Sequence, residues 1–558
     1  MGGSAMDENS TSSTGPSEGT TETNVTSSGL FARNATGLVR GVSQRSSFVI
    51  NFIPGHPTQA LAAGFFFIFA LFPGGNYLLA LLLTVPFTVA VSYSFGLLTA
   101  MIPRSGGDYM IVSRIIHPLV GLISSFCMTM AGLLSNAFFG VAFTTLGLAP
   151  ALTSIGMLEH SQGLINAGNT IAGSNTWKFV IGAVMMALSA LFMASNWRRT
   201  LRIQNVLFWV VTGGLTIAVI GALFTSHTAF VSHINSFFAP YTHSTTSYQQ
   251  IIHKATAAGV NVNPKFSFLR TIPVVGFFAT FAIFCYWSTF VGGELREASS
   301  TKTARNMALA GVSNLAMVAV FAIILFHTFG SSFMIASNGG GMPAQITVAP
   351  TYFFLMAGSM GNLLFALIII GSYIFFWPLI CYVSLLQPTR TFFAYAFDEI
   401  LPKRVAHVSR SGAPTVAIIV SWVLSVAVLL WGINAASFFQ IITYATLIQL
   451  IAMGLVGLSG ILVPYRRPEL YKSSTTQRRF LGLPVVVIAG IGGVLTTVFV
   501  WVLFFHYSAQ FGFTDPGKFF GVLGGLLVLA TVYYLGARAV RARQGVDLAL
   551  TYAEIPPE

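Results

Sequence analysis

Charge is scarce in this sequence. Asp, Glu, Lys and Arg make up 8% of the 558 residues, whereas 54% are hydrophobic, and the mean hydropathy is +0.76. A water-soluble domain needs about 25% charged residues, so this composition excludes one. Apolar runs of about 20 residues recur along most of the chain and are typical of polytopic helical membrane proteins. The alternating segments of about 10 residues expected of a membrane β-barrel are missing.

Cysteine, signal-peptide and metal-site patterns are also scarce or missing. The three cysteines, Cys127, Cys285 and Cys381, fall inside apolar stretches, so we expect no disulfide framework. We expect no cleavable signal peptide, and the first 45 residues are rich in Ser, Thr and Gly, which predicts a disordered tail. The spans contain no cluster of His, Asp and Glu, so we expect no metal site, no cofactor and no enzymatic activity.

The apolar runs predict about twelve membrane-spanning helices. They lie near 47–72, 77–101, 115–147, 177–196, 203–226, 272–293, 306–329, 358–386, 414–432, 436–464, 482–506 and 518–540. The expected division is a disordered cytoplasmic tail over 1–45, a membrane domain over 46–541 and a cytoplasmic tail over 542–558. The largest outward segment, 227–271, has neither the length nor the composition of a folded soluble domain.

Positive charge is concentrated in the tails and in one set of loops. The net charge is +13, and 23 of the 28 Lys and Arg residues lie in the tails and in the loops that follow even-numbered spans. The other five are Lys178, Lys254, Lys265, Arg270 and Lys518. This bias is the positive-inside pattern of membrane proteins rather than a nucleic-acid-binding face, and it predicts that both termini are cytoplasmic. We expect a plasma-membrane protein with lipid neighbours and no nucleic-acid partner.

The first span contains a segment that cannot be helical throughout. Pro54-Gly55-His56-Pro57 removes two backbone N–H groups and adds a glycine. Irregular backbone within a membrane is tolerated only where protein or a water-filled cavity surrounds it. We therefore predict two half-helices joined at 53–57, beside a cavity bordered by spans 3, 6 and 8. The ends of such half-helices can bind a carboxylate or a cation. A proline kink that only shapes packing is the alternative.

Three stretches in the loops expected on the cytoplasmic side resemble those of the amino acid–polyamine–organocation (APC) permeases. They are IPRSGGDYMIVSRIIHPLVGL (102–122), GGELREASSTKTARNMALAG (292–311) and QPTRTFFAYAFDEILPKRVAHVSRSGAPTVAII (387–419). Their order and spacing agree with the family over about residues 40–510. The resemblance implies an all-α polytopic fold with inverted repeats of five helices each over about 46–226 and 272–464. It also implies breaks in helices 1 and 6, two extra C-terminal helices over about 482–540, and secondary transport of amino acids or related amines.

The resemblance also implies that the substrate binds between the two breaks. The candidate substrate-binding residues are Ile53, Pro54, Gly55, His56, Phe281, Phe284, Cys285 and Tyr286. Neither Pro nor Gly marks a break at 283–286, so unwinding of span 6 follows from the resemblance alone, and packing is the alternative role for its aromatic residues. The glycine-rich break of the family is replaced here by Pro-Gly-His-Pro. The substrate of a relative therefore cannot be assigned to this protein by analogy.

No Asp, Glu, Lys or Arg lies in the middle of a predicted span. Intramembrane charges are costly and usually functional, so the site must be built from backbone ends, hydroxyls and aromatic rings. This favours a small or neutral amino acid over a strongly anionic or polycationic substrate. A permease for amines, polyamines or other organic cations and a non-transporting nutrient sensor are the alternatives. A channel is disfavoured because no span carries a polar stripe.

Coupling and gating candidates are few. His56 is the titratable group expected near the middle of the membrane, where it could carry a coupling proton or act as a neutral hydrogen-bonding residue. Thr212 and Ser372 are further coupling candidates, so H⁺, Na⁺ and exchange all stay open. At the expected cytoplasmic mouth, Arg104, Asp108 and Glu294 could form ion pairs that make and break during alternating access, or they could be solvated surface charges.

Overall fold

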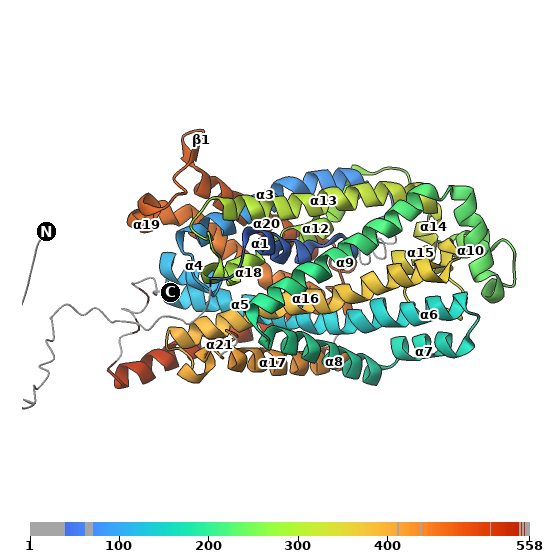
Figure 1. The fold of residues 1–558 in the computed structure, drawn as a ribbon. Helices are drawn as coiled ribbons and strands as arrows, with labels where there is room; N and C mark the ends of the chain where they lie inside the picture. The colour runs from blue at the N-terminus through green and yellow to red at the C-terminus, as the bar shows by residue number, and fades with distance from the viewer. Residues whose placement is uncertain are drawn as a thin grey trace, which may run out of the picture.

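A computed structural model describes residues 40–61, 68, 71–409, 412–435, 438–513, 515–545, 548 and 552. In these residues the chain forms a bundle of long helices that run along a common axis (Figure 1). Eleven of the described helices are long and apolar enough to cross a membrane. The expected all-α polytopic membrane fold is therefore confirmed.

The eleven spans begin with α3 and end with α21. They are formed by α3 (Tyr77–Met101), α5 (Pro118–Ala142) with η2 (Phe143–Leu148) and α6 (Ala149–Leu158), α8 (Asn175–Ala194), α9 (Trp197–Phe224), α12 (Phe268–Ala282) with η3 (Trp287–Phe290), α13 (Lys302–Phe329), α16 (Leu363–Phe397), α17 (Thr415–Ala435), α18 (Phe438–Arg466), α20 (Val485–His506) and α21 (Pro516–Arg543).

The predicted first span is broken. It begins with α1 (Gln44–Phe52), whose first turn is capped by the side chain of Ser43, and continues into the short η1 (Ile53–Gly55). Helical structure resumes at Pro57 and is described to residue 61, while 62–67 and 69–70 of this span lie outside the described residues. Of the predicted disordered tail over 1–45, residues 1–39 also lie outside the described residues, and α1 starts within its last residues.

Two predicted spans end well before their helices do. The third span, expected to end at 147, continues to Leu158 through the π-helical η2. Pro150 lies in the first turn of α6, where its missing N–H is tolerated, so the proline does not end the helix. The eighth span starts at Leu363 and continues to Phe397, well beyond the predicted end at 386.

The predicted outward loops contain short helices. They are α7 (Gln162–Gly173), α10 (His227–Thr242), α11 (Ser247–Ala257), α14 (Ser331–Ala336), η5 (Ser337–Gly341) and α15 (Tyr352–Met360). Figure 1 shows α10, α14 and α15 together at one end of the bundle. Aromatic packing joins them to a span, because the rings of Phe230 in α10 and Phe329 in α13 stack at 4.5 Å.

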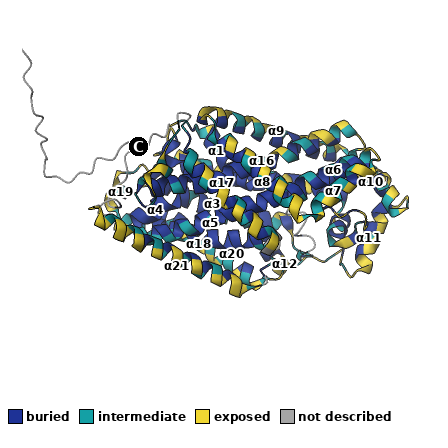
Figure 2. Ribbon diagram, turned by 90° about the horizontal axis from the view of Figure 1, so that it is seen from below, coloured by how far each residue is buried: buried dark blue, intermediate teal, exposed yellow. Residues whose placement is uncertain are grey.

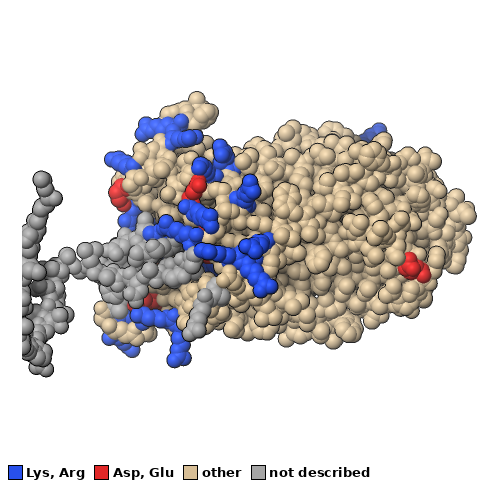
Figure 3. Space-filling view, in the orientation of Figure 1, with Lys and Arg blue, Asp and Glu red and all other residues tan. Residues whose placement is uncertain are grey.

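The other end of the bundle carries most of the charge. Its short elements are α4 (Asp108–Ile115), η4 (Gly292–Glu294), η6 (Lys403–Ala406), α19 (Pro468–Ser473), β1 (Arg479–Phe480) and β2 (Leu483–Pro484), the last two forming an antiparallel hairpin. Lys and Arg gather at this end, and tan uncharged surface covers most of the remaining view (Figure 3). We call it the basic end.

Burial follows the pattern of a protein surrounded by lipid. The interior of the bundle is buried and the exposed residues lie on its outside (Figure 2). Many of those exposed residues are large and apolar, including Leu191, Trp209 and Val528. Apolar side chains on the outer face of spanning helices are what a lipid environment stabilises.

Candidate functional site

The break in the first span is a tight turn followed by one extended residue. Ile53–Gly55 form a 3₁₀ turn, His56 has φ −53° and ψ 136°, and Pro57 begins the next helical stretch. The irregular backbone therefore covers 53–56, one residue less than the predicted 53–57. Pro57 suits the start of a helix because the first N–H groups there have no helical partner in any case.

The sixth span is also broken, although its sequence gives no local sign of it. The helix α12 ends at Ala282, residues 283–286 form turns, and the chain continues as the 3₁₀ turns η3 and η4. Side chains bridge this break and the break in the first span. Asn51 accepts a hydrogen bond from the backbone N–H of Ser288 at 2.8 Å, and Asn314 of α13 donates to the carbonyl of Phe52 at 3.0 Å.

Gly55 is required by this close approach. A Cβ atom at Gly55 would lie 2.8 Å from Nδ2 of Asn314, 3.0 Å from the carbonyl oxygen of Phe281 and 3.3 Å from Sγ of Cys285. Spans 1, 6 and 7 therefore meet at a point where no side chain fits.

His56 is completely buried and points toward spans 5 and 8. Its Nδ1 accepts a hydrogen bond from the backbone N–H of Thr58 at 3.1 Å, and its Nε2 lies 3.1 Å from Oγ1 of Thr212. The rings of Phe52, Phe208 and Phe376 surround it at 5.5–6.1 Å. Because Nδ1 accepts, the proton of the neutral ring is on Nε2 and is donated to Thr212. Both ring nitrogens are thus used within the protein.

A cavity lies beside the two breaks. The part nearest the breaks is lined by Pro54, Gln59, Ser135, Phe139, Thr280, Phe281, Phe284, Trp287, Ile380, Val383, Ser384, Ile442, Thr446 and Gln449. A second part is lined by Gln59, Leu71, Phe138, Phe277, Thr280, Phe281, Ile442, Thr443, Thr446, Phe504, Gln510 and Phe511. Five residues belong to both linings, so the two parts adjoin. Spans 1, 3, 6, 8, 10 and 11 border the cavity, and no charged side chain is among these described lining residues.

The predicted binding residues divide into two groups. Pro54, Phe281 and Phe284 line the cavity, whereas Ile53, Gly55, His56, Cys285 and Tyr286 are not among its lining residues. Tyr286 stacks on Phe95 at 3.9 Å, and its hydroxyl accepts from Nε2 of Gln449 at 2.8 Å. The thiol of Cys285 lies 3.7 Å from Nδ2 of Asn314. Tyr286 thus contacts a residue of the cavity lining, while Cys285 contacts α13.

The two other coupling candidates lie away from the cavity lining. Thr212 is the partner of His56. The hydroxyl of Ser372 donates to the carbonyl of Ile369 at 2.8 Å. A Cβ at Gly214 would meet the Cβ of Ser372 at 2.1 Å, so Ser372 lies at a close contact between α9 and α16.

Among the polar residues of the cavity that sequence reasoning missed, three have a polar atom without a partner. Gln59, Trp287 and Ser384 each line it and each carry a buried polar atom with no hydrogen-bond partner: Oε1, Nε1 and Oγ respectively. Gln59 and Trp287 follow the two breaks closely in sequence, and this position was the available signal. Ser384 belongs to α16 and had no such signal.

The basic end is closed by contacts between spans 1, 2, 6 and 8. Glu294 pairs with Arg390 through two hydrogen bonds of 2.8 and 3.1 Å, and each side chain is 1% exposed. Backbone contacts join Gly106 to Phe290 and Val42 to Glu294, at 3.1 and 2.9 Å. A Cβ at Gly107 would lie 2.2 Å from the ring of Phe290.

The three predicted gate residues lie in this region but do not pair as a group. Glu294 binds Arg390, while Nη1 of Arg104 donates to the carbonyl of Pro103 at 3.0 Å. Asp108 is fully buried and accepts from the hydroxyl of Ser124 at 2.6 Å. Burial raises the pKa of Asp108 to about 7.

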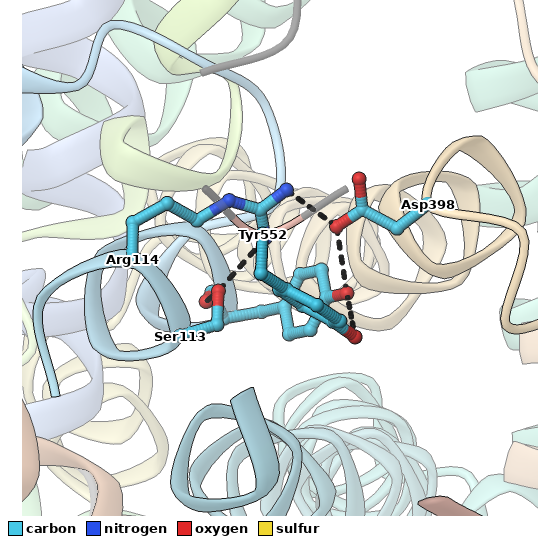
Figure 4. Close-up of polar contacts among 5 residues, drawn as sticks. Ser113, Arg114, Asp398 and Tyr552 are labelled. Atoms are coloured by element: carbon cyan, nitrogen blue, oxygen red, sulfur yellow. Dashed lines mark hydrogen bonds and ion pairs between the residues drawn. The ribbon is translucent and has the colours of Figure 1, made fainter. Parts of the chain in front are cut away.

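A second buried ion pair lies nearby at the basic end (Figure 4). Arg114 of α4 binds Asp398, which follows α16, at 2.6 Å. The hydroxyl of Tyr109 donates to the same carboxylate oxygen at 2.7 Å, and the hydroxyl of Tyr552 lies 3.0 Å from that of Tyr109. The guanidinium of Arg114 also lies 4.9 Å from the centre of the Tyr552 ring. This network joins α4, α16 and a residue of the C-terminal segment.

These features define a class of protein. A polytopic membrane bundle whose first and sixth spans are both interrupted beside an uncharged cavity has the architecture of a secondary transporter. The chain belongs to the amino acid permease family, because the sequence model of that family matches residues 43–528. The resemblance found in the loop motifs is thereby confirmed. A comparison with curated proteins gives no match. The family match includes both breaks and the cavity, and Tyr552 lies beyond it.

Proposed function

We propose that the protein is a secondary active transporter of neutral amino acids. The observation that carries this proposal is the uncharged lining of the cavity beside the two breaks. A ligand with a net charge would leave that charge buried without a partner, which costs several kcal/mol. A zwitterion has no net charge, and its ammonium and carboxylate can be met by neutral acceptors and donors.

A permease for polyamines or other organic cations is less well supported. Such a substrate needs an acidic partner when it leaves water. The described lining residues of the cavity include neither Asp nor Glu. The same reasoning disfavours arginine and glutamate as preferred substrates.

Alternating access is supported by the different closure of the two ends. At the basic end the Glu294–Arg390 pair and the contacts of Phe290 close the path. In the other direction the cavity continues to Gln510 and Phe511, in the loop that joins α20 to α21. In the transport cycle the contacts of the basic end separate and new contacts close the other end.

The proposed location is the plasma membrane, with both termini in the cytoplasm. The gathering of Lys and Arg at the basic end supports this orientation. The start of α1 lies at this end too, because the backbone N–H of Val42 donates to the carbonyl of Glu294. A tag fused to the C-terminus of the protein in intact cells should be accessible to antibody only after the membrane is permeabilised.

Coupling to an ion gradient is the remaining part of the proposal. We propose that a H⁺ or Na⁺ gradient drives accumulation and that His56 holds the break as a neutral hydrogen-bonding residue. Its two engaged ring nitrogens support this role over that of a proton carrier.

The test is uptake into proteoliposomes that contain the purified protein. A panel of amino acids and amines is measured with no gradient, with a proton gradient and with a sodium gradient. Accumulation of neutral amino acids under one of the gradients is expected. Preferred transport of arginine, glutamate or a polyamine would overturn the proposed substrate. Binding without transport would indicate a sensor on the same fold.

A further inference from the structure

The cavity has two chemically different halves. In the half nearest the breaks, Oε1 of Gln59, Nε1 of Trp287 and Oγ of Ser384 have no hydrogen-bond partner. These side chains are 7%, 5% and 1% exposed, so bulk water does not satisfy them. Buried polar atoms in proteins are almost always paired. A polar ligand that fills this half would supply the missing partners.

The other half is more apolar, although Gln59 and Thr446 line both halves and Gln510 also lines this one. The rings of Phe277 and Phe281 lie 4.9 Å apart, and those of Phe504 and Phe511 stack at 4.2 Å. Two hydroxyls in this half are already used within the protein. Thr280 donates to the carbonyl of Phe277 at 2.6 Å, and Thr443 donates to the carbonyl of Phe511 at 2.5 Å. This half therefore offers mainly aromatic surface to a ligand.

From these two halves we infer that the substrate is a neutral amino acid with a large apolar side chain, aromatic or branched aliphatic. This inference rests on the proposed function. The α-ammonium donates to Oε1 of Gln59, while the α-carboxylate accepts from the indole N–H of Trp287 and the hydroxyl of Ser384. The side chain packs between Phe281 and Phe511.

The size of the apolar half sets the expected selectivity. A small amino acid such as glycine or alanine leaves the phenyl rings without contacts and gains little from apolar burial. Burial of a leucine or phenylalanine side chain is expected to tighten binding about 10- to 100-fold. The aromatic faces beside the polar half also attract an ammonium group, which a substrate of either size carries. Selectivity therefore comes from the side chain and not from the charged groups.

The first experiment compares substrates on the full-length protein in proteoliposomes. Concentration dependence of uptake is measured for phenylalanine, leucine, alanine and glycine. A KM for phenylalanine or leucine at least tenfold below that for alanine is expected. Equal or tighter binding of alanine or glycine would overturn the inference and leave the proposed function intact. If no neutral amino acid is bound or transported, the proposed function itself fails.

Two substitutions separate the halves. Phe504→Ala, at a residue that lines only the apolar half, enlarges that half and should raise the KM for phenylalanine about tenfold while leaving that for alanine within about twofold. Ser384→Ala removes a donor to the common carboxylate and should raise both values equally. Phe224→Ala, at a ring on the outside of the bundle that is 83% exposed, is the matched control and should change neither. An equal effect of Phe504→Ala on both substrates would contradict the two-half arrangement. If a variant does not fold, the KM comparison on the unmodified protein still tests the inferred preference for large apolar side chains.

Discussion

Glu294→Gln is expected to open the basic end. Glu294 and Arg390 form a buried ion pair. The third guanidinium nitrogen of Arg390, Nη1, has no hydrogen-bond partner. Removal of one partner of a buried ion pair costs about 3–5 kcal/mol, because the other charge is left without compensation. Glutamine retains one acceptor oxygen, so the lower end of this range, about 3 kcal/mol, applies. Opening hydrates Arg390, and the cost therefore falls on the closed state. The ratio of closed to open protein should decrease about 100-fold.

A cysteine introduced at Thr289 reports on this change. Thr289 is buried in the closed end, where it accepts a hydrogen bond from Thr99 at 3.0 Å. The rate of its reaction with a membrane-impermeant maleimide should rise when Glu294→Gln is added. The three native cysteines are buried, and the protein without the introduced cysteine gives the background rate.

Glu297→Gln is the matched control. Glu297 pairs with Lys302 at 2.9 Å, but the two side chains are 51% and 58% exposed. Exposed pairs contribute about 0–1 kcal/mol, so this variant should react at the unmodified rate. The thermal unfolding midpoint of each variant separates opening from global unfolding. Equal labelling rates for Glu294→Gln and Glu297→Gln would refute the role of the buried pair in closure.

Three further predictions follow from the site. Gly55→Ala should lower the unfolding midpoint and abolish uptake, because the added Cβ would lie 2.8 Å from Nδ2 of Asn314. Gly213→Ala is the control and should be tolerated, because a Cβ there has no atom within 4 Å. His56→Gln should leave gradient-driven accumulation in place with weaker transport, since one of two buried hydrogen bonds is lost; abolished accumulation with intact exchange would instead identify a proton carrier. The pKa of Asp108 is raised, so the folded protein binds more protons than the unfolded one between pH 3.8 and about 7. Its stability should fall as pH rises through that window, and Asp108→Asn should remove this component from unfolding midpoints measured across it.

The spans could be predicted because the bilayer imposes a length and a composition on each of them. Tyr77–Met101 matches its predicted range at both ends, since Asn76 caps its start and Pro103 soon follows its end. The third span was predicted to end at 147, well before Leu158, where its helix ends. A proline in the first turn after a π-helical stretch removes no needed hydrogen bond, and sequence alone does not reveal that stretch.

The site was only partly accessible to sequence reasoning. Pro54 and Gly55 mark the first break because their backbone chemistry is unusual whatever surrounds them. Which side chains face the cavity depends on the rotation of each helix against its neighbours. Trp287 lines the cavity, whereas its neighbour Tyr286, the last residue of the break, does not line it and instead binds Gln449. Likewise, the partner of Glu294 is almost a hundred positions away, at Arg390, and only packing brings the two together.

The break in the first span leaves few backbone N–H and C=O groups without a hydrogen-bond partner. Prolines at 54 and 57 remove two N–H groups that a broken helix would otherwise have to satisfy. The carbonyl of Phe52 is bound by Asn314, and the N–H of Thr58 is bound by His56. The protein thus pairs these backbone groups internally instead of presenting them to a ligand. We therefore expect substrate recognition to depend on side chains beside the break, with Gln59 foremost among them. Substitutions in the break should accordingly affect folding, and substitutions in the cavity lining should affect selectivity.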